Sequence, residues 1–179
     1  MPLELYVPEE MDVDQIQTTN GAVTARRVPG GAALRTRDGS IRITDARGDV
    51  TAETSDGDIS VDGTDGTLST VTQDGAIQVR DPGRVGEIST RDGNVMTDVP
   101  AVADDAEIES SDGNLLLRIG EELETVLTAD TADGDILVSD VAPGLQIRRQ
   151  TDSQLEAVVG DGSTPLRAHT NNGDVMVRG

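Results

Sequence analysis

The residues best suited to metal chemistry lie in one acidic stretch, residues 53–63, with the sequence ETSDGDISVDG. The segment from Asp58 to Gly63 matches the first half of an EF-hand loop, in which oxygen atoms bind calcium. The second half does not match, because Asp65 stands where that loop has an apolar residue and Ser69 stands where it needs a glutamate ligand. We therefore expect no specific metal site and no cofactor.

Candidate catalytic groups are few. His169 is the single histidine, and the chain has no cysteine. Alternation with its neighbours predicts that His169 faces outward on a strand, exposed to solvent. Sugar-cleaving solenoid enzymes place carboxylate pairs beside aromatic platforms, whereas Tyr6 is the only aromatic residue here. The sequence thus predicts a non-enzymatic protein without catalytic residues.

The charge of the chain limits its partners and its surroundings. Its 179 residues carry a formal net charge of -20, and all 14 basic residues are arginine. Such a field repels polyanions, so we expect no nucleic-acid partner. The composition is typical of salt-loving archaea, where salt screens self-repulsion. No stretch is apolar enough to span a bilayer, and the start lacks the features of a secretory signal. We therefore expect a cytoplasmic protein, or a cell-surface protein if the chain is a fragment.

The elements that position these residues come from an internal repeat, T-x-D-G-x-apolar-x-apolar. Eight copies are clear, and their first four steps are 18 residues each, followed by steps of 20 and 21 residues. A decayed ninth copy is predicted at residues 150–157, with Ser153 in the glycine column. The glycines of the clear copies are Gly21, Gly39, Gly57, Gly75, Gly93, Gly113, Gly134 and Gly173.

Each copy reads as two alternating strands joined by a turn, with one face of each strand buried. Stacked copies share a core, so the fold class is all-β, a right-handed parallel β-solenoid of 18–21 residues per coil and eight to nine coils. Two or three sheets per coil are both compatible with the pattern. We expect one domain over residues 1–179, with an entry strand and N-terminal cap at 1–17 and coils at 18–179.

The Asp-Gly pair forms the predicted corner of each coil, because glycine accepts turn conformations and aspartate bonds nearby backbone. A threonine or serine three residues before each glycine predicts a ladder of hydroxyl groups. Stacked carboxylates ~4.8 Å apart should attract cations diffusely along this edge. The predicted column consists of Asp38, Asp56, Asp74, Asp92, Asp112, Asp133 and Asp152.

The repeat resembles the putative-adhesin domains of unknown function found in bacteria and archaea, and the opening LYVPEEMDVDQIQTTNGAV resembles the usual entry of that family. The resemblance covers nearly the whole chain and implies a β-solenoid with an Asp-Gly corner on each coil. It implies no shared activity. Bactofilins, which polymerise into cytoskeletal filaments, are more distant solenoids, and haloarchaeal halofilins pair a bactofilin-like protein with one that is similar to this type.

Two further features bear on assembly. Residues 26–47 carry six arginines against two acidic residues, whereas residues 92–147 carry one arginine against fourteen. Either these are solvated faces, or the basic region of one copy meets the acidic region of another. The sequence also predicts an uncapped last coil, with Val175 and Val177 as a possible end-to-end interface.

The leading functional hypothesis is a self-associating or polymerising structural scaffold of the cytoskeletal, cell-shape type in a halophilic archaeon. Its expected partner is a second copy or another β-solenoid protein, with no nucleic acid and no direct membrane insertion. The alternative is an adhesin-like binding domain of the cell surface or envelope.

Overall fold

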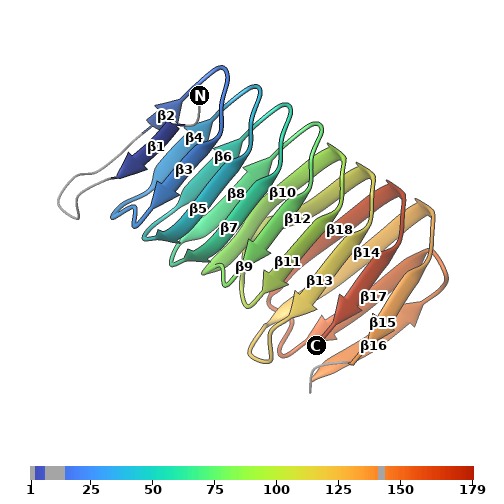
Figure 1. The fold of residues 1–179 in the computed structure, drawn as a ribbon. Helices are drawn as coiled ribbons and strands as arrows, with labels where there is room; N and C mark the ends of the chain where they lie inside the picture. The colour runs from blue at the N-terminus through green and yellow to red at the C-terminus, as the bar shows by residue number, and fades with distance from the viewer. Residues whose placement is uncertain (1–2, 7–14, 141–143) are drawn as a thin grey trace.

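The computed structural model describes residues 3–6, 15–140 and 144–179, and all their regular elements are strands. They form a β-solenoid with two sheets, A and B, that face each other along a rod (Figure 1). Each coil therefore contributes one strand to each sheet. In spatial order, sheet A consists of β1 (Leu3–Tyr6), β3 (Val23–Arg26), β5 (Ile41–Ala46), β7 (Ile59–Thr64), β9 (Ile77–Arg80), β11 (Val95–Val99), β13 (Leu115–Ile119), β19 (Val175–Arg178) and β15 (Ile136–Ser139).

Sheet B holds the strands that precede each Asp-Gly corner. Its strands run parallel except β17, which is antiparallel to both neighbours. In spatial order, sheet B consists of β2 (Gln15–Gln17), β4 (Ala32–Arg35), β6 (Val50–Glu53), β8 (Thr67–Val71), β10 (Arg84–Asp92), β12 (Val102–Asp112), β18 (Thr164–Asn172), β14 (Thr125–Asp133), β17 (Gln154–Val159) and β16 (Leu145–Gln150).

The core lies between the sheets and is aliphatic. In β7, for example, Ile59 and Val61 are buried while Asp62 is exposed, which follows the predicted alternation. The inward columns predicted for sheet B, such as Leu68, Thr70 and the following Thr72, are likewise buried. The sequence pattern thus identifies the buried face of the coils correctly.

The predicted hydroxyl ladder is present at the corner. From the second coil onward, each Thr or Ser hydroxyl donates to the carbonyl oxygen of the glycine in the adjacent coil, as Thr54 Oγ1 does to Gly39 O at 2.9 Å. The other bonds of this ladder are Thr36 to Gly21, Thr72 to Gly57, Thr90 to Gly75, Ser110 to Gly93, Thr170 to Gly113 and Thr131 to Gly173. Glycine N–H groups donate in the opposite direction, to the Asp or Asn carbonyl of the next coil, at 2.8–3.1 Å.

The spatial order of the coils departs from their sequence order at one place. The coil of β18 and β19, here called the inserted coil, lies between the coil of β12 and β13 and the coil of β14 and β15. In Figure 1 the red β19 accordingly stands between the yellow β13 and the orange β15. The prediction that Val175 and Val177 form an end-to-end interface is wrong, because both lie inside the solenoid with exposures of 0% and 1%.

The ninth copy is also corrected. Ser153 lies next to the corner column, where its carbonyl accepts a bond from Thr131 N, but the chain then turns back into sheet B. Strands β16 and β17 form an antiparallel hairpin, so the segment is not a coil and Asp152 belongs to its turn. Glycine is absent from this corner, and glycine is what allows the other coils to stack closely there. The described chain therefore contains eight coils.

The predicted N-terminal cap at residues 1–17 includes two strands. β1 pairs in parallel with β3 in sheet A, and β2 pairs in parallel with β4 in sheet B. The parts of this prediction at residues 1–2 and 7–14 lie outside the described residues.

Candidate functional surfaces

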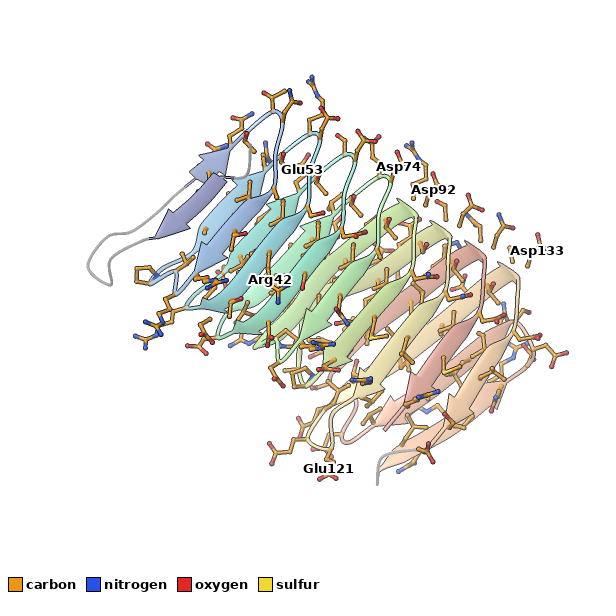
Figure 2. All side chains as sticks on the ribbon, in the orientation of Figure 1. Arg42, Glu53, Asp74, Asp92, Glu121 and Asp133 are labelled. Carbon is orange, nitrogen blue, oxygen red and sulfur yellow. The ribbon has the colours of Figure 1, made fainter. Side chains whose placement is uncertain are left out.

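The corner carboxylates line one edge of the rod, on which Asp74, Asp92 and Asp133 are labelled in Figure 2. Desolvation and the neighbouring carboxyl groups of Asp38 and Asp74 raise the pKa of Asp56 above its ordinary value. A hydrogen bond with Asp74 and desolvation raise the pKa of Asp92. The edge is thus a line of mutually repelling groups, as the repeat predicted.

Two asparagines interrupt this edge, and one has a clear role. Asn172 of the inserted coil lies between Asp112 and Asp133, and its amide nitrogen donates to Asp112 Oδ1. The other, Asn20, pairs with Asp38 at the first corner. Neutral residues at these positions reduce the repulsion between stacked carboxylates.

The acidic stretch that resembles a calcium loop is part of a coil. Asp58 Oδ1 accepts a bond from Ala76 N of the adjacent coil at 2.8 Å, which is a structural role. The same bond recurs farther along the rod: Asn94 Oδ1 accepts from Asn114 N, Asn114 Oδ1 from Asp174 N, and Asp174 Oδ1 from Asp135 N. Among the residues that the structure describes, no group of three or more acidic or histidine side chains has metal-binding geometry.

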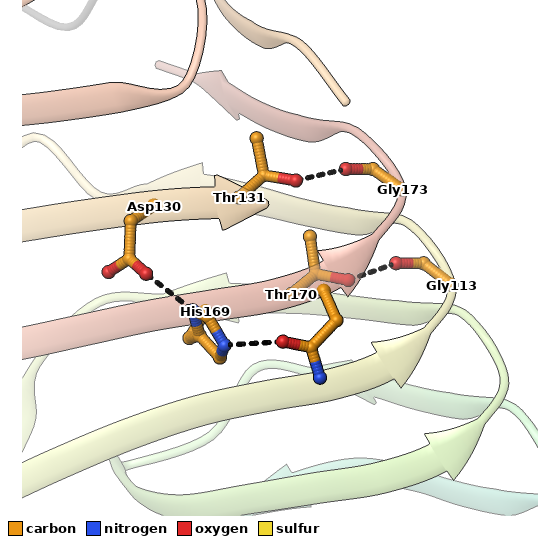
Figure 3. Close-up of polar contacts among 7 residues, drawn as sticks. Gly113, Asp130, Thr131, His169, Thr170 and Gly173 are labelled. Atoms are coloured by element: carbon orange, nitrogen blue, oxygen red, sulfur yellow. Dashed lines mark hydrogen bonds and ion pairs between the residues drawn. The ribbon is translucent and has the colours of Figure 1, made fainter. Parts of the chain in front are cut away.

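His169 lies on the outer face of β18, as predicted, but with defined partners. Its Nδ1 pairs with Asp130 of β14, and its Nε2 lies 3.1 Å from Asn171 Oδ1 (Figure 3). Glu109 is its neighbour on β12. Desolvation lowers the pKa of His169, but Asp130, Asn171 and Glu109 together raise it above the ordinary value. Both ring nitrogens face oxygen atoms, an arrangement that suits the protonated ring.

The predicted basic region forms shallow hollows near the N-terminal end. One hollow of about 380 Å³ is lined by Arg26, Arg27 and Arg42, with Asp45 and Asp62 beside them. Arg42 projects from the outer face of sheet A (Figure 2). Acidic neighbours therefore offset much of the positive charge at this place.

An apolar row on the outer face of sheet A is the feature that the sequence analysis missed. Four strands place an apolar side chain at the same rung, three residues after the corner glycine. Leu137 at the edge of the sheet is 48% exposed, and the others are half-buried. The apolar row consists of Met96, Leu116, Met176 and Leu137, in spatial order.

The residues of this column change from polar to apolar along the rod. In the first four coils the equivalent positions are polar: Thr24, Arg42, Ser60 and Gln78. Polar residues flank the row on both sides, and Arg118 lies 3.7 Å from Asp98. One border consists of Asn94, Asn114, Asp174 and Asp135, and the other of Asp98, Arg118, Arg178 and Ser139. An apolar row between polar borders, with Asp174 and Asp135 on one side and Arg178 on the other, has the composition of a docking surface.

None of the described residues belongs to a helix that could cross a membrane. Comparison with curated proteins and with solved structures found no match. A family model, Toastrack DUF4097, does match, and it agrees with the stacked β-strands described above. Because the match spans residues 3–178, nearly the whole sequence, the chain belongs to the Toastrack DUF4097 family, a family of unknown function.

Proposed function

We propose that the protein is a non-enzymatic structural scaffold that self-associates through the outer face of sheet A. The observation that carries the proposal is the change from a polar to an apolar column at Met96. Solubility favours polar residues on such a face, so four consecutive apolar rungs call for a partner that covers them.

The borders of the apolar row favour a second copy as that partner. Two copies packed face to face, with the two-fold axis along the rod, bring the Arg178 border of one copy opposite the Asp174 border of the other. Such a contact is isologous, with apolar rows in the centre and complementary charges at the rim. A scaffold of the cell-shape type in a salt-loving cell is the biological setting that we propose for it.

The test compares two arginine substitutions in the same column. Leu116→Arg places a charge in the apolar row, and Ser60→Arg places the same charge in the polar half. Sedimentation velocity over a range of protein concentrations, at 0.1 M and molar KCl, measures association. We expect the parent and Ser60→Arg to associate and Leu116→Arg to remain monomeric. A monomeric parent under all conditions, or equal association of the two variants, would contradict the proposal.

A further inference from the structure

The inserted coil makes its contacts with coils that precede it in the chain by 39 to 60 residues. Leu115 N donates to Asp174 O on one side, and Val175 N donates to Asp135 O on the other, at 2.9 and 3.0 Å. The hydroxyl ladder also passes through the inserted coil, from Thr131 to Gly173 and from Thr170 to Gly113 (Figure 3). Both strands of this coil are therefore paired along both edges.

The space that the inserted coil fills is one coil wide. Without it, β12 and β14 stand two strand spacings apart, ~9.6 Å. Its buried side chains, Leu166, Ala168, Val175 and Val177, are each at most 1% exposed. We call this space the slot; an empty slot exposes apolar side chains and two unpaired strand edges on each of its walls.

Charge favours this coil in the slot at one rung of sheet B. If β14 paired directly with β12 in the present register, Asp130 would lie beside Glu109 and Asp133 beside Asp112. The inserted coil separates these like charges with His169 and Asn172. Arg167 likewise lies beside Glu107. Stacked aspartates also occur at other corners, such as Asp92 beside Asp112, so the specific gain is the separation of Asp130 from Glu109 by His169.

Nothing in these contacts requires the inserted coil to come from the same molecule. Its link to the preceding hairpin is the segment 160–163, in which Gly160 and Gly162 have φ angles of 61° and 66° and Asp161 is exposed. The intermolecular contacts would be identical to the intramolecular ones, so protein concentration and strain in the link decide between them.

We infer that the slot also accepts the inserted coil of a second copy, so that copies join by exchanging residues 164–178. This inference deepens the self-association of the proposed function and rests on it, but it uses the strand edges of these coils and not the outer face of sheet A. Exchange gives a specific contact that dissociates slowly, because four strand edges must separate before the copies part.

Engineered cysteines test the exchange in the full chain, which has no cysteine of its own. Glu107 on β12 and Arg167 on β18 are exposed register partners, at a spacing that a disulfide can bridge. Glu87 lies one strand farther away, opposite Glu107, and is too distant from Arg167. The double variant Glu107→Cys/Arg167→Cys establishes the reactivity of the pair by forming its bond within one chain.

The decisive sample mixes Glu107→Cys chains with Arg167→Cys chains that carry a larger tag, unfolds and refolds them together over a range of concentrations, and oxidises them. We expect a mixed disulfide dimer that increases with protein concentration and exceeds the dimer formed by Glu87→Cys with Arg167→Cys. If the double variant forms its internal bond while the mixed dimer never exceeds that control, the inference is overturned.

Repeating the mixture in a Met96→Arg background, which alters the apolar row on β11 away from the slot, separates the two proposals. A mixed disulfide dimer that still forms in this background shows that exchange depends on the slot and not on the apolar row. Association that is sensitive to Leu116→Arg, in a protein without mixed dimers, would leave the proposed function standing and reject the exchange.

Discussion

Replacing one corner glycine by alanine gives the sharpest test of how closely the coils stack. A Cβ atom on Gly75 would lie 2.2 Å from the carbonyl oxygen of Gly57, where carbon and oxygen need about 3.3 Å. The corner must open by about 1 Å, because the obstacle is backbone. This movement stretches two bonds beyond their useful length: Gly57 N to Asp74 O, now 2.9 Å, and Thr72 Oγ1 to Gly57 O, now 3.1 Å.

Each of these bonds contributes about 1 kcal/mol net, so we expect Gly75→Ala to cost ~2–3 kcal/mol. In a chain of this size the melting temperature should fall by roughly 5–10 °C. Thermal unfolding followed by circular dichroism measures the change, with Ala76→Ser as the control. Ala76 is the exposed neighbour, and other coils carry Ser40 or Asn94 at its position. Equal melting temperatures for the two variants would refute the close stacking of the corners.

Three other substitutions test separate parts of the structure. His169→Gln should destabilise the fold most below pH 6.5, the ordinary pKa of histidine, because the raised pKa shows that the fold favours the protonated ring. The loss should shrink as pH rises through the elevated pKa of the folded state. Melting temperatures measured from acid to alkaline pH test this. Asp56→Asn should stabilise the protein at neutral pH, because the raised pKa of Asp56 shows that its charged form is disfavoured in the fold. The gain in melting temperature should shrink at acid pH and in molar salt. A gain that is unchanged in molar salt contradicts this prediction. Val177→Asp should cost at least ~3 kcal/mol in denaturant unfolding, whereas the exposed Arg178→Ser should have little effect; a silent Val177→Asp would place β19 outside the core.

Most of the fold could be predicted, because the repeat pattern determines the strands, the corner and the buried face of each coil. Alternation places Ile59 and Val61 inside, and the threonine column gives the hydroxyl ladder. These features depend on contacts between adjacent coils, which are the same at every step. The local pattern is therefore sufficient for the coil, its corner and its buried face.

The order of the coils was not predicted, because every coil carries the same repeat pattern and can therefore stack on any other coil. A spacing of 21 residues between Gly113 and Gly134 is compatible with direct stacking. The signal that could have revealed the insertion is charge: direct stacking would place Asp130 beside Glu109, and His169 is the residue that relieves it.

The apolar row was accessible to sequence reasoning but was overlooked. It occupies the third position after each corner glycine, where Arg42 and Ser60 change to Leu116 and Met176. The change lies on the outer face, where the alternation that identifies the core carries no signal. What covers the row depends on a partner, and the repeat of a single chain holds no information about that.

The inserted coil divides the molecule into two parts that must fold in different ways. The first six coils follow one another in sequence and in space, so they can add stepwise as the chain emerges from the ribosome. The coil of β14 and β15 cannot be added in this way, because the strands that it pairs with on the rod, β18 and β19, come later in the chain. We therefore expect these two coils to take their places together, and damage confined to β18 or β19 should also disorder β14 and β15, which lie upstream of it in the chain.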